Sequence, residues 1–419
     1  MKDLGGFCMN RGCIPFVHMM TAIRILRNTA LGKSMGLDFS GLTKEYASLS
    51  RRRLELIAFM GQGVRSMLKK NNVTFIEGTG RIRGKGAIDV DGKNITFKKL
   101  ILATGTRWRK PDFPGADLEG VVNTDHLLTM KAVPESAMLF GESPWLLEVA
   151  QFLAGFGCKV TLAVPGKRIL SEETKTIAAR LKKKLKDDGI EIQTRAVIER
   201  VAKRSAGLTV SFSAQGNPQQ RDVDLLLTLE RDASLKGLDE ESTFLPVNDK
   251  AETAAEHVYA IGDLTAPPGK RYSHRAAGMG LVAAENAMGN QAFFNPGSLV
   301  RVLFTHPEAA AIGLTPKEAK QQGYDVIVGT APLAMNPLGM ILAEDEGVVE
   351  VVGDKKYGEI LGVHILGPGA SEMTGAALCC IKLEATPDTL AGMAFPHPTL
   401  SESLAEAARD ALGKPIYLP

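Results

Sequence analysis

Residues 137–164 have the pattern of a strand, a glycine turn, a helix and a second strand. The first apolar run begins at Ala137 and ends at Gly141, a helical pattern continues to Phe156, and a second strand is predicted at Lys159–Val164. A strand, a crossover helix and a following strand form a βαβ unit whose strands are parallel. The sequence therefore predicts an α/β protein with a parallel sheet.

Further elements extend this pattern in both directions along the chain. Before it, helical periodicity covers residues 15–33 and 44–70, and strands are predicted at residues 73–76, 87–90 and 95–102. After it come a helix at 171–186, short strands up to residue 229, a buried strand at 257–262 and a helix at 273–288. From about residue 300, strands (301–304, 348–352, 359–365) mix with helices (316–322, 370–383, 399–412), which predicts a separate α+β domain.

Composition excludes several classes of protein. The 419 residues, 44% apolar and 23% charged, are typical of a globular protein with about two to three domains. No apolar stretch suits a membrane span or a signal peptide, so we predict a cytoplasmic protein, and dispersed basic residues argue against nucleic-acid binding. We assign no metal site. Of the five cysteines, Cys158, Cys379 and Cys380 are predicted to be buried and inert.

The other two cysteines, Cys8 and Cys13, lie in the segment Gly-Gly-Phe-Cys-Met-Asn-Arg-Gly-Cys-Ile-Pro. In a regular helix these side chains would point roughly 140° apart, with Cα atoms outside the ~4.4–6.8 Å of a disulfide, so the chain between them must bend. Gly12 can supply the bend, and Pro15 suits the first turn of a following helix. Cys13 would then lie at a helix N-terminus, which favours a thiolate. The spacing alone leaves a reactive pair and two unlinked thiols as alternatives.

This segment resembles, at eight positions, the redox-active disulfide motif of the family of dihydrolipoamide dehydrogenase, glutathione reductase and mercuric reductase, and is most similar to the first. The resemblance implies two Rossmann-like domains, which bind FAD and NAD(P), followed by an α+β dimerisation domain. It implies that Cys8 is the outer, interchange thiol, that Cys13 faces the flavin, and that the two form a reversible disulfide. A mercuric reductase is disfavoured, because no cysteine pair lies near the carboxyl end.

Further segments resemble the flavin-binding parts of that family. Ala-Thr-Gly-Thr at residues 103–106 follows a predicted strand, and Tyr-Ala-Ile-Gly-Asp at residues 259–263 delivers a carboxylate to the end of a strand, where α/β sheets bind ligands. A helix-capping role is the alternative for this aspartate. The resemblance implies that FAD contacts the following residues: Gly80, Thr104, Gly105, Thr106, Asp263, Tyr272, Ser273 and His274.

Two departures concern the dinucleotide motifs. Only seven residues precede Cys8, whereas the family has a strand, Gly-x-Gly-x-x-Gly and a helix there, so we expect an amino-terminally truncated sequence; impaired flavin binding is the alternative. In the second unit Gly141 is followed by Ser143 and Leu146 in place of glycines, and Val164 takes the place of the acidic residue that binds ribose. Residues 230–234 read Glu-Arg-Asp-Ala-Ser where the family has Gly-Arg-x-Pro-Asn. We expect NAD(P) binding to be weak or absent.

A third departure concerns Glu148, which matches a family glutamate beside the flavin. The lysine that pairs with that glutamate is replaced by Val17, so we expect Glu148 to raise its pKa or to find another partner.

Near the carboxyl end, Phe-Pro-His-Pro-Thr-Leu-Ser-Glu at residues 395–402 resembles the family's acid/base segment. A carboxylate from Glu402 on one ring nitrogen of His397 would raise the basicity of the other, as deprotonation of a dithiol requires. The resemblance implies that His397 reaches the disulfide of the other subunit, hence a homodimer.

These observations predict four segments: a first part of the FAD domain (1–130), a degenerate NAD(P)-like domain (131–250), a second part of the FAD domain (251–295) and a dimerisation domain (296–419). The predicted function is FAD-dependent dithiol/disulfide oxidoreduction through Cys8 and Cys13, with a lipoyl-like dithiol as substrate. The alternative is a dimeric scaffold protein that has lost turnover. The sequence names neither the dithiol nor the electron acceptor.

Overall fold

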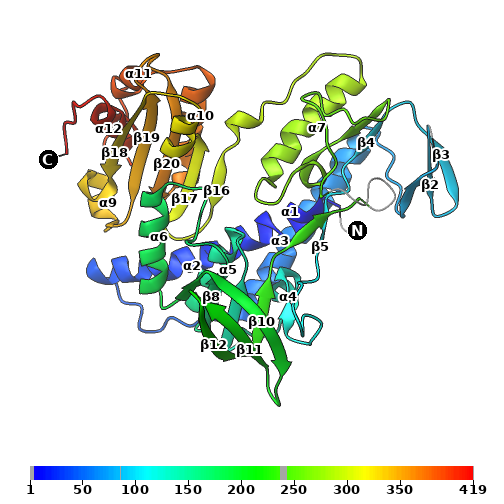
Figure 1. Cartoon of the computed structure of the whole chain (residues 1–419), viewed down its shortest axis with the longest axis horizontal. Helices are drawn as coiled ribbons and strands as arrows, with labels where there is room; N and C mark the ends of the chain where they lie inside the picture. The colour runs from blue at the N-terminus through cyan, green and yellow to red at the C-terminus, as the bar shows by residue number, and fades with distance from the viewer. Residues whose placement is uncertain (1–3, 85, 236–242, 419) are drawn as a thin grey trace.

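The computed structural model describes residues 4–84, 86–235 and 243–418. The first three helices carry the cysteine segment, which lies where the first helix meets the second (Figure 1). They are α1 (Gly6–Asn10), α2 (Cys13–Ser34) and α3 (Tyr46–Lys70). The buried side chains of α2, among them Phe16, Met19 and Ile23, pack into the same apolar core as the helix α5 (Trp145–Gly155), so the cysteine segment rests on the central domain.

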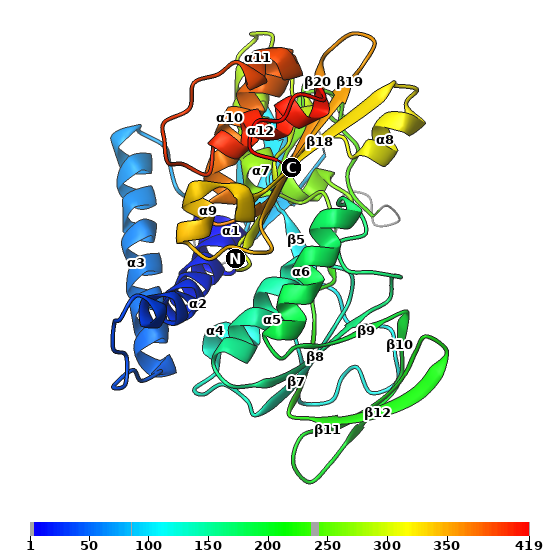
Figure 2. The same ribbon diagram turned by 90° about the vertical axis from the view of Figure 1, so that its left-hand side faces the viewer.

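A five-stranded parallel sheet forms that central domain, in the order β6 (Val121–Val122), β13 (Leu225–Thr228), β7 (Ser136–Phe140), β8 (Lys159–Val164), β9 (Glu191–Thr194). Helices α5 and α6 (Lys175–Asp187) cover one face (Figure 2). The other face packs on an antiparallel sheet of β10 (Ala196–Lys203), β11 (Leu208–Ala214) and β12 (Asn217–Val223). The predicted βαβ unit is therefore confirmed, with its second strand at the predicted bounds.

A second parallel pair, β4 (Leu100–Leu102) with β15 (Val258–Ala260), packs beside α7 (Ser273–Ala287). It is joined to the central domain by β5 (Thr106–Trp108), which pairs with β14 (Arg231–Ala233). The short helices α4 (Thr124–Thr129) and η1 (Gly262–Thr265) follow β6 and β15. A separate antiparallel sheet contains β1 (Gly80–Ile82), β2 (Ala87–Val90) and β3 (Lys93–Thr96).

The C-terminal domain is an antiparallel sheet with helices packed on it, which confirms the predicted α+β pattern. Its strand order is β16 (Arg301–Leu303), β17 (Glu308–Gly313), β20 (Ile360–Gly367), β19 (Val348–Asp354), β18 (Val326–Pro332). Its helices are η2 (Pro296–Ser298), α8 (Pro316–Gln321), η3 (Leu333–Met335), α9 (Pro337–Ile341), α10 (Ala370–Lys382), α11 (Pro387–Ala391) and α12 (Glu402–Ala411).

Several predictions were wrong in detail. Residues 73–76 form no strand, and the side chains of Val73, Phe75 and Ile76 are about half exposed, because no described strand pairs with them. The predicted strand at residues 95–102 is two strands, β3 and β4, and the helix predicted from residue 171 begins at Lys175. Cys379 is exposed, whereas Cys158 and Cys380 are buried as predicted.

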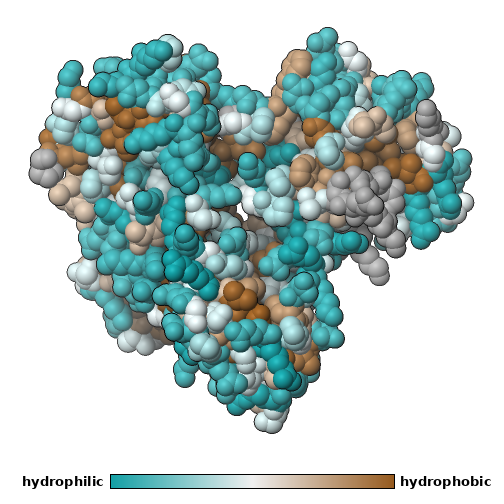
Figure 3. All heavy atoms as spheres, in the orientation of Figure 1, coloured by the Kyte–Doolittle hydropathy of each residue, from teal (hydrophilic) through white to brown (hydrophobic). Residues whose placement is uncertain are grey.

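The surface is mainly hydrophilic on the face shown in Figure 3, with apolar patches over the C-terminal domain and near β2 and β3. Within the described ranges, every helix is too short or too polar to cross a lipid bilayer.

Candidate functional site

The two cysteines lie on either side of a break between α1 and α2, as the spacing predicted. Helix α1 ends at Asn10, and the backbone N–H groups of Arg11 and Gly12 both donate to the carbonyl of Phe7, at 2.8 Å. Gly12 is required at this break because a Cβ there would lie 2.9 Å from the Phe7 ring. Cys13 is then the first residue of α2. Both side chains are free thiols in this structure.

Local hydrogen bonds favour a single thiolate on this pair. The Cys13 thiol donates to Cys8, and this bond lowers the pKa of Cys8 to about 6 against the opposing effect of burial. The same bond and the burial of Cys13 raise the pKa of Cys13. Ser273, at the start of α7, lies 3.4 Å from the Cys13 sulfur and stabilises the charge on either sulfur. The helix N-terminus favours the thiolate at Cys13, whereas the hydrogen bond favours it at Cys8, so the two sulfurs share one proton.

The first testable prediction concerns the pH dependence of thiol reactivity. Because the pKa of Cys8 is about 6, alkylation of Cys8 by iodoacetamide should be fast above that pH and slow below it. Cys13→Ala removes the hydrogen-bond donor, so the midpoint should rise toward the ordinary value of 9.0. The measurement is the pH profile of peptide alkylation by mass spectrometry. An unchanged midpoint in Cys13→Ala would show that the pair does not share a proton.

Two of the residues predicted to contact flavin, Thr106 and Asp263, lie near these thiols, after the ends of β4 and β15. Asp263 follows β15, Thr106 begins β5, and both bind the guanidinium of Arg231: its Nη1 lies 3.1 Å from Asp263 Oδ2 and 3.2 Å from Thr106 Oγ1. The guanidinium also lies over the Phe7 ring, 4.4 Å from the centroid. Arg231 is therefore the residue that joins the cysteine loop to the predicted flavin contacts.

The remaining predicted flavin contacts do not all lie beside the cysteine segment. Thr104 donates to the Ser234 carbonyl at 3.3 Å. Tyr272 and His274, the sequence neighbours of Ser273, have their ring centroids 5.4 Å apart. Gly80 lies on β1, in the separate sheet beside β2 and β3 (Figure 1).

The donor set fits the part of FAD nearest the thiols. Gly105 and Gly262 have φ of +64° and +71°, and a Cβ at Gly262 would come within 3.1 Å of Ala276 on α7, so glycine suits both turns. Asp263 and Thr106 offer oxygen atoms that can bind ribityl hydroxyls. In this structure both oxygen atoms are bound by the guanidinium of Arg231, with which a ligand hydroxyl would compete.

Glu148, on α5, accepts a hydrogen bond from the backbone of Phe304, and its carboxyl group has a raised pKa. Burial raises the pKa of its carboxyl group to about 7, although the backbone N–H of Phe304 donates to Oε1 at 2.9 Å. The loss of the family lysine predicted either a raised pKa or another partner for Glu148, and both are observed. Trp145, at the start of the same helix, packs edge-on against Phe16 of α2, with 4.7 Å between the ring centroids.

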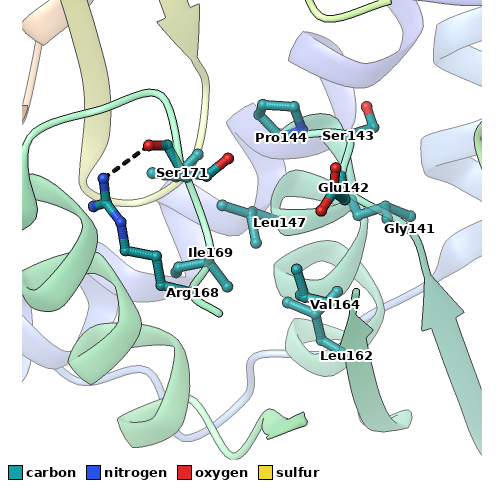
Figure 4. Close-up of a pocket in the computed structure, with 12 residues that line it drawn as sticks. Gly141, Glu142, Ser143, Pro144, Leu147, Leu162, Val164, Arg168, Ile169 and Ser171 are labelled. Carbon is teal, nitrogen blue, oxygen red and sulfur yellow. Dashed lines mark hydrogen bonds between the residues drawn. The ribbon is translucent and has the colours of Figure 1, made fainter. Parts of the chain in front are cut away.

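The turn after β7 does not fit a dinucleotide. Leu146 is 1% exposed, and its Cδ1 would lie 3.3 Å from a Cβ on Gly141, so this side chain fills the space above the turn. Figure 4 shows the apolar side chains of Leu147, Val164 and Ile169 in the adjoining pocket, and Val164 cannot accept a hydrogen bond from a ribose. We therefore assign no step to NAD(P).

Arg168, which also lines this pocket, is not available to a phosphate group. Its guanidinium donates to the carbonyls of Ser171, Glu173 and Thr174, so it holds its own loop (Figure 4).

His397 and Glu402 form the predicted pair. Nδ1 of His397 lies 2.9 Å from Oε1 of Glu402, and the other carboxylate oxygen accepts from the Thr399 N–H at 2.9 Å. Although burial opposes it, these two contacts lower the pKa of Glu402. The imidazole is 64% exposed, so its Nε2 side faces outward. Within one chain the pair lies in the C-terminal domain, apart from α1 (Figure 1).

Sequence reasoning missed two residues of this site. Arg231 was seen only as part of a departure from a family motif, and its contact with Asp263 required the pairing of β14 with β5. Asp125 was not considered at all; its carboxylate binds Arg11, between the two cysteines, at 3.1 Å. No local pattern connects residues this far apart in the sequence.

The chain is similar to known proteins over nearly its whole length. The sequence pattern of the pyridine nucleotide-disulphide oxidoreductase family matches residues 1–288, and the pattern of its dimerisation domain matches residues 299–408. A dihydrolipoyl dehydrogenase of Bacillus subtilis is 30% identical over 99% of this chain and 92% of its own length. One from Thermus scotoductus is 33% identical over 97% of this chain and 90% of its own length.

Solved structures show the same fold. The HOCl-induced flavoprotein disulfide reductase RclA of Escherichia coli superposes with a TM-score of 0.84 at 24% identity, over 96% of this chain and 91% of that one. LpdA of Mycobacterium tuberculosis superposes with a TM-score of 0.88 at 21% identity, over 97% and 91%. The chain belongs to the pyridine nucleotide-disulphide oxidoreductase family.

Proposed function

We propose that the protein is a flavoprotein disulfide oxidoreductase in which Cys8 and Cys13 exchange electrons with a dithiol substrate. The observation that carries this proposal is the pair of thiols on either side of the Gly12 break, with a lowered pKa at Cys8 and a serine on the sulfur of Cys13. The full-length similarity to dihydrolipoyl dehydrogenases supports a lipoyl-like dithiol as the substrate class.

The exchange begins with the Cys8–Cys13 disulfide. A thiolate of the substrate attacks the sulfur of Cys8, the S–S bond breaks, and Cys13 leaves as a thiolate with the bonding electrons. The second substrate sulfur then attacks the mixed disulfide and releases Cys8. The substrate has lost two electrons and two protons and has become a disulfide, and the protein holds two electrons on its thiols. Ser273 stabilises the leaving thiolate at Cys13 through its hydroxyl group.

His397 takes a proton from the substrate dithiol, and Glu402 holds the imidazole in the tautomer whose Nε2 can accept it. Because the pair lies apart from the cysteines within one chain, we propose a homodimer in which the His397 of one subunit serves the thiols of the other.

FAD, when bound, supplies the route by which the two electrons leave the cysteines. Asp263 and Thr106 would hold its ribityl chain, and Tyr272, Ser273 and His274 would lie beside its ring system. The final acceptor is left open, because the turn after Gly141 does not fit a dinucleotide.

The test uses the purified protein from its natural source. Heat release of the bound cofactor should yield FAD, and thiol counting should show that dihydrolipoamide converts the Cys8–Cys13 disulfide to two thiols. Cys158→Ser is the matched control, because that thiol is buried and away from the pair. Thiols that never oxidise in the native protein, or Cys8→Ser with undiminished turnover, would favour the scaffold alternative instead.

A further inference from the structure

We propose that Asp125 positions the cysteine loop and so determines how readily Cys8 and Cys13 form their disulfide. The inference rests on the proposed function, since it concerns the same thiols. Asp125 lies in the first turn of α4, outside every motif of the sequence, and its side chain makes no contact with either sulfur among the described residues. It therefore acts through the loop.

One carboxylate oxygen of Asp125 is connected to both ends of α1. Oδ2 accepts from Arg11 Nη1 at 3.1 Å and from Trp108 Nε1 at 2.9 Å. The Trp108 ring in turn packs edge-on against Phe7, 5.7 Å between centroids. Phe7 directly precedes Cys8, and Arg11 directly precedes the Gly12 break, so the two supports enclose the part of the loop that carries Cys8.

Several described hydrogen bonds of the loop are internal to it. Asn10 Nδ2 donates to the carbonyls of Leu4 and Gly6, and the Arg11 and Gly12 N–H groups donate to Phe7. These bonds shape the turn of α1. The Cys13–Ser273 contact and the Arg231 guanidinium over Phe7 join the segment to α7 and β14. Asp125 adds the connection to α4.

Helix α4 is itself held firmly. At its N-terminus the Asn123 side chain accepts from the Asp125 N–H at 2.8 Å. At its other end the carbonyls of Leu127 and Leu128 accept hydrogen bonds from Tyr46 and Arg53, two buried side chains of α3. A support for a reactive loop works when the support is itself fixed in this way.

The consequence concerns disulfide geometry. A disulfide forms only when the two Cβ atoms come within a narrow range, and a loop that moves more freely spends less time there. Asp125→Ala removes the support from the α4 side, and Arg11→Met removes it from the loop side. Their electrostatic effects on a thiolate are opposite: the first leaves the Arg11 cation unbalanced, which favours the thiolate, and the second removes that cation.

The experiment equilibrates the full-length protein with glutathione buffers of known thiol to disulfide ratio and measures the oxidised fraction of Cys8 and Cys13 by differential alkylation. Both variants should lower the equilibrium constant for disulfide formation by roughly fivefold, within the range of one charge-assisted hydrogen bond. The double variant should be no worse than either single one, because both remove the same connection. Asp125→Asn keeps an acceptor for Trp108 and should lie between wild type and Asp125→Ala. Glu119→Ala, which breaks the exposed Glu119–Lys203 pair, is the matched control and should match wild type.

Opposite shifts in Asp125→Ala and Arg11→Met would mean that charge alone acts, and would overturn the inference. Values within twofold of wild type in both would overturn it too. If Asp125→Ala fails to fold, Arg11→Met and Asp125→Asn give the same decision. A wild-type protein that forms no disulfide in any buffer would instead contradict the proposed function.

Discussion

His397→Ala is expected to slow the reduction of the Cys8–Cys13 disulfide by a dithiol roughly 10²–10⁴-fold, the usual contribution of a positioned base. The imidazole is 64% exposed and its Nδ1 is bound to Glu402, so Nε2 is the nitrogen that can take the substrate proton. The alanine variant should keep the fold, because the side chain contributes little to the core. The measurement is the rate of thiol appearance after rapid mixing with dihydrolipoamide.

The pH dependence makes this test specific. A dithiol that is already a thiolate needs no base, so the deficit of His397→Ala should shrink as the pH rises past the ordinary pKa of a free thiol. Glu402→Gln keeps the hydrogen-bond geometry but not the charge, and should cost less than His397→Ala. A deficit that is the same at every pH, or no deficit at all, would show that His397 only supports the structure.

The second large effect concerns NADH. We expect the unmodified protein to bind NADH poorly, because Leu146 fills the space above Gly141 and Val164 leaves the ribose hydroxyls without an acceptor. Unpaired hydroxyls cost on the order of 1–3 kcal/mol. Restoring Ser143→Gly, Leu146→Gly and Val164→Glu together should therefore tighten binding by roughly ten- to hundredfold. Binding is measured by titration of the intact protein with NADH.

The restored protein requires a control for stability, since Leu146 and Val164 are buried in the core. Leu146→Gly alone creates the same cavity without the ribose acceptor, so it should lose stability and gain little affinity. Low-micromolar binding by the unmodified protein, with no gain on restoration, would show that this turn accepts the dinucleotide by other contacts.

The sequence predicted those features that depend on local pattern. The βαβ unit, the bend at Gly12 and the contact of His397 with Glu402 all follow from periodicity or short spacing. The strand predicted at residues 73–76 is absent for a physical reason: a segment rich in β-formers becomes a strand only when a partner supplies the hydrogen bonds, and no described strand does so. Propensity could not reveal this.

Features that depend on distant contacts could not be predicted. Strand β17 was missed because it is a run of small alanines, and β18 because a glycine and a closing proline interrupt its apolar residues. Arg231 binds Asp263, which is 32 positions away in the sequence, and Asp125 binds Arg11, which is 114 positions away. Only the assembled fold brings Arg231 to Asp263 and Asp125 to Arg11.

The aromatic rings beside the cysteine loop have a practical consequence for spectroscopy. The chain has two tryptophans, and both Trp108 and Trp145 pack edge-on against Phe7, at 5.7 and 5.9 Å. All indole emission of the protein therefore originates next to the residue that precedes Cys8. Since thiolates and disulfides quench indole fluorescence to different extents, the intrinsic emission of the unlabelled protein should follow the oxidation state of its thiol pair in real time.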